Sequence, residues 1–284
     1  MDDNKLFNIY FSINNINDQA PVFTTDATFS TPEFNTTVSG SRTFTIGEVD
    51  ANDPDGLSNI SYSISGSEIS IDSSSGVIAF VNEADYETKN TYTATVTASD
   101  GGLTAEQNIT VNVTNSNDND PVFTSSETFS ADENQTTIGT VTATDADNDT
   151  ITFTVSGDNL QITSAGVLSF ITAPDYETKN SYTGTVTASD NSTDPVFGAR
   201  ETTQNITVNI VNLNDNSPIF TSNATFSAEE NQTAIGTVTA SDSDGNGITY
   251  SISGSDITID ASSGVIAFVS APDYETTTSY SATV

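Results

Sequence analysis

The chain has 284 residues, with 39 acidic residues against 5 basic ones and a formal net charge of −34. A charge of this sign repels nucleic acid and anionic membrane surfaces and attracts divalent cations. The sequence contains no Cys and no His, which excludes disulfides, thiol or imidazole catalysis, and zinc sites built from those residues.

From the N-terminus, the first predicted element is a strand over residues 6–13, which leads into the phrase at residues 15–23. This phrase sets Asn and Asp residues ahead of a proline and an aromatic, and it returns at residues 115–123 and 212–220. Asp118 follows Asp18 by 100 residues, and the third copy follows after 97 more. A fixed period of this length predicts one domain per copy.

We therefore expect four segments along the chain. Residues 1–17 are predicted to be the last strand and linker of a preceding repeat, followed by repeat one (18–117), repeat two (118–214) and repeat three (215–284), which lacks its last strand. Because the predicted repeats are incomplete at both ends, we expect the chain to be a piece of a longer protein. The alternative is that residues 6–13 of one copy complete repeat three of the next by strand addition, giving a head-to-tail filament.

Short segments within the repeats alternate apolar and polar residues, as half-buried strands do. Residues 92–98, 108–113 and 205–210 show this period of two, and turns rich in Gly, Asp, Asn and Ser separate such segments. No segment has helical periodicity or the length of a transmembrane span, and no secretory signal is visible. The pattern predicts an all-β fold of seven-strand β-sandwiches.

Acidic residues recur in one order within the repeats. Asp-x-Asp occurs at residues 53–55, 145–147 and 242–244, Asp-Tyr-Glu at 85–87, 175–177 and 273–275, and Ala-Ser-Asp at 98–100 and 188–190. Calcium binds six to eight oxygens from carboxylates, amides and backbone carbonyls, which these motifs supply. Two carboxylates 4 Å apart repel by about 1 kcal/mol in bulk water, so the clusters are expected to hold a cation.

Two other interpretations of the acids fit the sequence less well. A single Asp in a turn is commonly just solvated. Here, however, a Glu-Asn element at residues 133–134 and 230–231 joins the linker phrase and the three motifs above, and these five motifs repeat in the same order. Catalytic carboxylate pairs need one asymmetric cleft, whereas the same set recurs in every repeat, so we expect no enzyme. Residues 194–197 copy the letters Asp-Pro-Val-Phe without the preceding Asn-x-Asn-Asp, and we interpret them as an extended hairpin loop.

Together these motifs resemble cadherin repeats, of the kind found in bacterial and other large surface proteins. The linker pattern D-x-N-D-N-x-P-x-F is similar to residues 115–123, and the elements P-E-N, D-x-D, D-R-E and A-x-D have counterparts along each repeat in that order. The resemblance covers essentially the whole chain. It implies an extended rod of Greek-key sandwiches with calcium between successive repeats, about three ions per complete junction.

The resemblance also implies the ligand sets. The first junction would use Glu33, Asp85, Glu87, Asn115, Asn117, Asp118, Asn119, Asp145, Asp147 and Asp190, with Asp149 near a backbone-carbonyl ligand. The second would use Glu133, Asp175, Glu177, Asn212, Asn214, Asp215, Asn216, Asp242, Asp244 and Asn246. A half-junction at the front would have Asn15, Asn17, Asp18, Asp53, Asp55, Asn59 and Asp100, and one at the back Glu230, Asp273 and Glu275.

The sequence departs from the family pattern at the linker. Its first residue is Asn in all three copies (Asn15, Asn115 and Asn212), where the family usually has Asp. The loss of a negative charge is expected to weaken the ion site that this residue would bridge. Gln19 replaces Asn in the front linker, and Tyr replaces the Arg of D-R-E.

The predicted function is that of a calcium-binding, extracellular or cell-surface rod with a structural and adhesive role, a segment of a larger adhesin, stalk or filament. Ca²⁺ at the junctions would rigidify the tandem repeats. The expected partners are Ca²⁺ and a second copy, another surface protein or a glycan, without nucleic acid or membrane insertion. The alternatives are a recognition module carried on the sandwich loops and a calcium-independent spacer.

Overall fold

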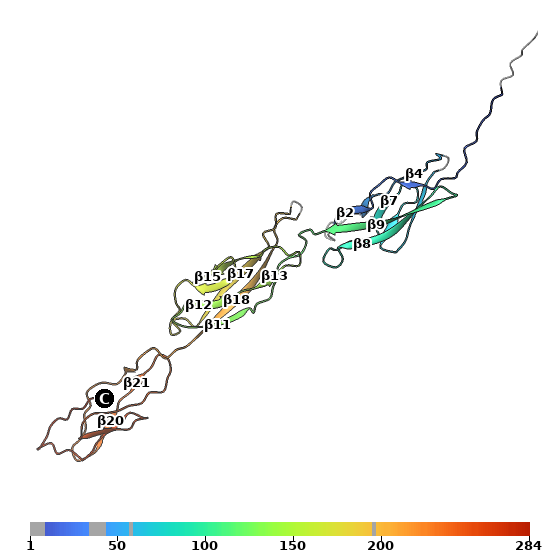
Figure 1. Cartoon of the computed structure of the whole chain (residues 1–284). Helices are drawn as coiled ribbons and strands as arrows, with labels where there is room; N and C mark the ends of the chain where they lie inside the picture. Colours follow the sequence, from blue (N-terminus) through green and yellow to red (C-terminus); the bar gives the residue numbers. More distant parts are fainter. Residues whose placement is uncertain (1–8, 34–43, 57–58, 195–196) are drawn as a thin grey trace, which may run out of the picture. The chain divides into compact units, whose positions relative to one another are not determined.

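The computed structural model describes residues 9–33, 44–56, 59–194 and 197–284. All secondary-structure elements assigned within these ranges are β-strands (Figure 1), as the period-two patterns predict. The same ranges contain no helix that is long and apolar enough to span a bilayer. The chain divides into two compact units, which are Met1–Val122 with Thr144–Ile151 and Ser189–Thr202, and Phe123–Ala143 with Thr152–Ala188 and Thr203–Val284.

The strands of repeat one lie in the first unit. They are β1 (Val22–Phe23), β2 (Thr28–Pro32), β3 (Thr45–Glu48), β4 (Ala51–Asn52), β5 (Ser61–Ile64), β6 (Ile69–Ile71), β7 (Val77–Phe80), β8 (Thr91–Ser99) and β9 (Thr104–Thr114). Their sheets have the orders β2-β9-β8-β5, β3-β7-β6 and β1-β4. β2 runs parallel to β9, and the long hairpin of β8 and β9 is antiparallel (Figure 1).

The core of repeat one lies between its four-stranded and three-stranded sheets. Val96 on β8 and Val111 on β9 are fully buried and belong to one hydrophobic cluster with Ile78 and Phe80 on β7. The rings of Tyr92 and Phe80 pack in an edge-type arrangement, with 4.8 Å between their centroids. Alternate residues of each sheet thus face the other sheet, which is the packing of a β-sandwich.

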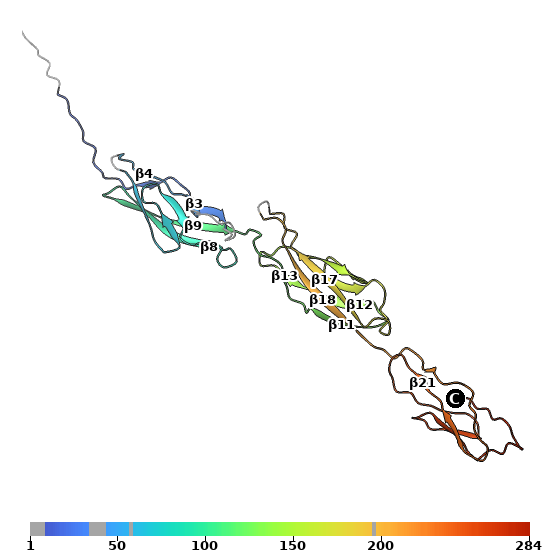
Figure 2. The same ribbon diagram turned by 180° about the vertical axis from the view of Figure 1, so that it is seen from behind.

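Repeats two and three supply the remaining strands. They are β10 (Val122–Phe123), β11 (Thr128–Asp132), β12 (Thr137–Thr140), β13 (Ala143–Thr144), β14 (Thr152–Gly157), β15 (Leu160–Ile162), β16 (Val167–Phe170), β17 (Ser181–Ser189), β18 (Glu201–Val211), β19 (Ile219–Phe220), β20 (Ala234–Thr237), β21 (Ala240–Ser241), β22 (Ile257–Ile259) and β23 (Val265–Phe268). The orders β11-β18-β17-β14 and β12-β16-β15 repeat those of repeat one, including the parallel first pair (Figure 2).

Repeat three forms the three-stranded sheet β20-β23-β22. Where the other repeats pair the third and fourth strands of the larger sheet (β8 with β5, and β17 with β14), its described residues form a single bridge between Ser253 and Thr283. Residues 9–13 of the predicted N-terminal strand are exposed and outside any strand, and residues 6–8 lie outside the described ranges.

One turn has the same backbone in all three repeats. Gly76, Gly166 and Gly264 have φ angles of 74°, 87° and 73°, in the left-handed region that favours glycine. The carbonyl of Gly76 accepts a hydrogen bond of 2.9 Å from the backbone N–H of Val49. A Cβ atom at Gly76 would lie 2.0 Å from the carbonyl oxygen of Val49, so the backbone approach leaves no room for a side chain.

Candidate metal centres

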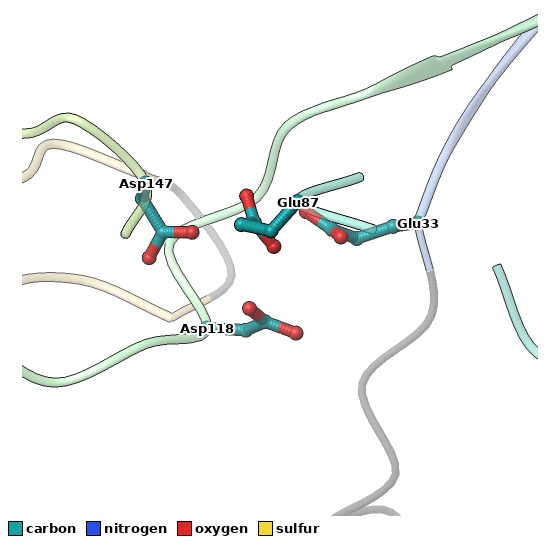
Figure 3. A group of neighbouring side chains, drawn as sticks. All are labelled: Glu33, Glu87, Asp118 and Asp147. Atoms are coloured by element: carbon teal, nitrogen blue, oxygen red, sulfur yellow. The ribbon is translucent and has the colours of Figure 1, made fainter. Parts of the chain in front are cut away.

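Four carboxylates predicted as ligands meet in the first unit. Glu33 follows β2, Glu87 precedes β8, Asp118 lies in the linker after β9, and Asp147 follows β13. One oxygen from each lies within 4.8 Å of the others, and Figure 3 shows the four side chains pointing toward a common space. Glu33 and Asp147 are only 5% and 6% exposed, so two of the four residues are shielded from solvent.

Glu33 is held by backbone groups of two other segments. One carboxylate oxygen accepts the N–H of Tyr86 at 2.5 Å, and the other accepts the N–H of Ser116 at 2.7 Å. These bonds bring the Asp-Tyr-Glu turn and the linker to the end of β2. Burial raises the pKa of Glu33 above its usual value, while the two N–H groups oppose this rise.

The charges of the cluster act on one another. Partial desolvation, followed by the negative charge of Glu33, raises the pKa of Glu87 to about 7. Desolvation and then the charge of Asp147 raise the pKa of Asp118. Each ionised carboxylate therefore makes the next one harder to ionise, and a cation among them would reverse this effect.

Other oxygens in the first unit are buried without a hydrogen-bond partner. They are Oδ1 of Asn17, Oδ2 of Asp100, Oε1 of Gln107, Oδ1 of Asn117 and Oδ2 of Asp145. Buried polar atoms normally have partners, so an orphaned set of this kind needs an explanation. All five are carboxylate or amide oxygens, the donor type that calcium takes, and all but that of Gln107 belong to predicted ligands. The donor set therefore fits a hard cation.

The second cluster repeats the first in the second unit. Oxygens of Glu133, Glu177 and Asp215 lie within 4.8 Å of one another. Glu133 is 2% exposed, and its two oxygens accept the N–H groups of Tyr176 at 2.8 Å and Leu213 at 2.7 Å. The carboxylate of Glu133 thus has the same role as that of Glu33.

A linker asparagine lies among the carboxylates of each cluster. The Nδ2 of Asn119 contacts Asp118 and Asp147 at 2.9 Å and Glu87 at 3.4 Å. The corresponding Nδ2 of Asn216 lies 2.8 Å from Asp215, 2.9 Å from Asp244 and 3.2 Å from Glu177. These amide N–H groups lessen the repulsion between the acids, and the Asn216 side chain is the largest cause of the lowered pKa of Asp244.

A third group, Glu230, Asp273 and Glu275, is exposed. Its oxygens also lie within 4.8 Å of one another. The hydroxyl of Thr276 is the main cause of the lowered pKa of Asp273. Because exposed acids are well solvated, this group has the weakest requirement for an ion of the three.

Several predicted ligands lie outside the three clusters. Asp85 and Asp175 each accept hydrogen bonds from the Thr three residues later, and Asp53, Asp145 and Asp242 each accept the N–H of the second Asp of their motif. Asp190 is buried and accepts the N–H groups of Ser192 and Arg200. Asn59, Asn214 and Asn246 are exposed, and Asp149 is half-buried. The backbone N–H of Asp18 donates a hydrogen bond to the carboxylate of Asp55.

Two contacts near the first cluster were not predicted. The Nε of Arg200 forms an ion pair of 2.6 Å with Asp120. The side-chain amide of Asn117 donates a hydrogen bond to the carbonyl of Gly198. Both contacts come from the long connection between β17 and β18, the segment interpreted as a hairpin loop. The scarcity of basic residues, 5 in the chain, was the one signal that could have drawn attention to Arg200.

The family model of the Cadherin domain matches residues 34–114. Protocadherin-11 X-linked of Pongo pygmaeus is 32% identical over 231 residues, or 75% of this chain and 16% of the relative. Human Protocadherin Fat 1 is 33% identical over 237 residues, or 75% of this chain and 5% of the relative.

Among solved structures, mouse cadherin-23 EC22-24 matches with a TM-score of 0.70 and 27% identity, covering 91% of this chain and 90% of that one. The similarity to solved structures thus extends over nearly the whole chain, whereas the chain spans only 16% and 5% of the length of the two curated relatives.

Proposed function

Because this chain is built of cadherin-family repeats, we propose that it is a calcium-binding structural and adhesive segment of an extracellular or cell-surface protein. Calcium at the linkers would fix each repeat to the next, and about three ions would occupy a complete junction. The proposal assigns the molecule no catalytic role. Its adhesive partner would be a second copy, another surface protein or a glycan.

The observation that carries the proposal is the cluster of Glu33, Glu87, Asp118 and Asp147. Four acids from four segments converge within 4.8 Å, and two of them are buried. Like charges at this separation destabilise the fold unless protons or a cation compensate them. The orphaned oxygens of Asn117 and Asp145 supply further ligands of the type that calcium needs.

The size of the calcium effect follows from linkage. A ligand that binds the folded state alone adds RT ln(1 + [L]/Kd) to its stability. With about 1 mM external calcium and a Kd of roughly 10⁻⁴ M, each site adds about 1.4 kcal/mol. Several sites would add several kcal/mol outside a cell, and almost nothing at the submicromolar calcium of cytosol. This difference makes the array responsive to its compartment.

The proposal is tested by thermal unfolding and by luminescence of Tb³⁺, a calcium substitute that tyrosine sensitises. Tyr86 lies next to the ligands in sequence, and the chain has no Trp to interfere. We expect calcium to raise the unfolding midpoint relative to chelator, and Tb³⁺ emission under tyrosine excitation to be displaced by calcium.

The matched variants are Glu87→Gln in the cluster and Glu106→Gln, an exposed position on β9. Glu87→Gln should weaken the calcium response and the Tb³⁺ signal, and Glu106→Gln should leave both unchanged. A midpoint that is the same in calcium and in chelator would favour the calcium-independent spacer instead.

A further inference from the structure

The first residue of each linker is an asparagine that makes the same hydrogen bond in all three copies. Its side-chain Nδ2 donates to the backbone carbonyl of the second Asp in the Asp-x-Asp motif. The bonds are 2.6 Å from Asn15 to Asp55, 2.7 Å from Asn115 to Asp147, and 3.0 Å from Asn212 to Asp244.

The chemistry of this bond requires an amide. A backbone carbonyl only accepts hydrogen bonds, so the NH₂ of the side chain has to face it. An ionised Asp at the same position has no donor and would place a negative oxygen against the carbonyl. The amide keeps its own oxygen for another partner, and Oδ1 of Asn212 is buried without a hydrogen bond.

The same Asp is held at a second point by the residue four positions further along the linker. The backbone N–H of Asn119 donates to Oδ2 of Asp147 at 2.9 Å, and its side-chain amide donates to Oδ1 at 2.9 Å. The equivalent distances are 2.8 and 2.9 Å for Asn216 on Asp244, and 2.8 and 3.2 Å for Gln19 on Asp55. Each linker is therefore attached to one turn through its first and its fifth residue.

We propose that the asparagine at the first linker position is a positioning residue that fastens the linker to the Asp-x-Asp turn without any ion. Its amide nitrogen makes this attachment, while its oxygen remains available to a cation. An Asp would offer a charged ligand but lose the attachment. Asn at this position thus lowers the affinity for calcium but keeps the linker in its conformation when calcium is low.

The attachment is tested in chelator, where calcium cannot contribute. Hydrogen exchange of the linker amide of Asn119 is compared in the wild-type chain, Asn115→Ala and Asn115→Asp. Loss of one hydrogen bond of ordinary strength should speed this exchange about fivefold in both variants. Asn112→Asp, an exposed β9 position with the same charge change, should leave it unchanged. Equal exchange in the wild type and Asn115→Ala would overturn the proposal, as would equal acceleration by Asn112→Asp.

The expected effect of Asn115 on calcium affinity rests on the proposed function. It is measured by calorimetric calcium titration. Asn115→Asp should bind calcium more tightly than the wild type, since it adds a carboxylate, while still exchanging faster in chelator. Weaker binding by this variant would overturn this expected effect. If the wild-type chain bound no calcium, the proposed function and the expected effect would both fail, while the exchange experiment would still decide whether the attachment exists.

Discussion

The turn at Gly76 offers the most direct test of how the repeats are built. Two costs are expected for Gly76→Ala. A non-glycine residue at a φ of 74° costs about 1 to 2 kcal/mol. Its Cβ would also lie 2.0 Å from the carbonyl oxygen of Val49, and forcing such a contact apart typically costs a further 1 to 3 kcal/mol or so. The sum is about 2 to 5 kcal/mol.

Gly66 separates the two costs, because its φ is 96° but no atom lies within 4 Å of its added Cβ. Gly66→Ala should lose only the conformational term, about 1 to 2 kcal/mol. Asparagine tolerates left-handed backbone, so Gly66→Asn should leave the free energy of unfolding nearly unchanged. Gly76→Asn should still lower it, because the close contact with Val49 remains.

The assay is urea unfolding in chelator, followed by tyrosine fluorescence and far-ultraviolet circular dichroism. Each variant is compared with the wild-type chain by its midpoint at constant slope. Equal losses for Gly76→Asn and Gly66→Asn would refute the reasoning, because they would mean that the backbone approach to Val49 carries no cost.

Three further outcomes are expected. In saturating calcium, Glu133→Ala should lower the free energy of unfolding by about 3 to 6 kcal/mol, because two charge-assisted bonds to backbone N–H groups are lost. The carboxylate of Glu230 accepts one such bond, at 3.1 Å, so Glu230→Ala should cost clearly less. Equal urea midpoints for the two variants would contradict this. In chelator, stability should fall as pH rises from about 4.5 to about 7, because the folded state retains the proton of Glu87, whose pKa is raised to about 7, after the unfolded state has lost it. Glu87→Gln should flatten this slope in pH-dependent melting, and a rise in wild-type stability over the window would refute the assignment. Arg200→Ala should cost less than about 1 kcal/mol, because the ion pair with Asp120 remains partly exposed to water, and a larger loss in urea unfolding would mean that the loop depends on it.

Much of the fold could be predicted from alternation alone. The pattern at residues 92–98 corresponds to β8, and residues 108–113 lie within β9, because one face of each strand is buried in a two-sheet core. The predicted strand over residues 6–13 is different. Its described part, 9–13, is exposed and unpaired, since alternation indicates what a strand could bury but not whether a partner lies beside it.

The clustering of acids was also predictable, whereas the contacts of individual side chains were not. Repetition at a fixed spacing was enough to anticipate that Glu33, Glu87 and Asp118 belong together. No pattern in the residues indicates that the amide of Asn115 faces a carbonyl, because this depends on which backbone group the fold places opposite it. The ion pair of Arg200 with Asp120 likewise spans 80 residues and depends on the course of a loop.

The parallel pairing of β2 with β9 has a mechanical consequence. β2 lies near the start of repeat one and β9 ends it, and the two strands run side by side in the same direction through five residue pairs, from Thr28 opposite Thr110 to Pro32 opposite Thr114. Tension on the two ends of the repeat would pull these strands in opposite senses along their own axes. The hydrogen bonds between them would then be loaded together in shear and would not open one after another. β11 and β18 are paired in the same parallel way, so repeat two would be loaded in the same manner.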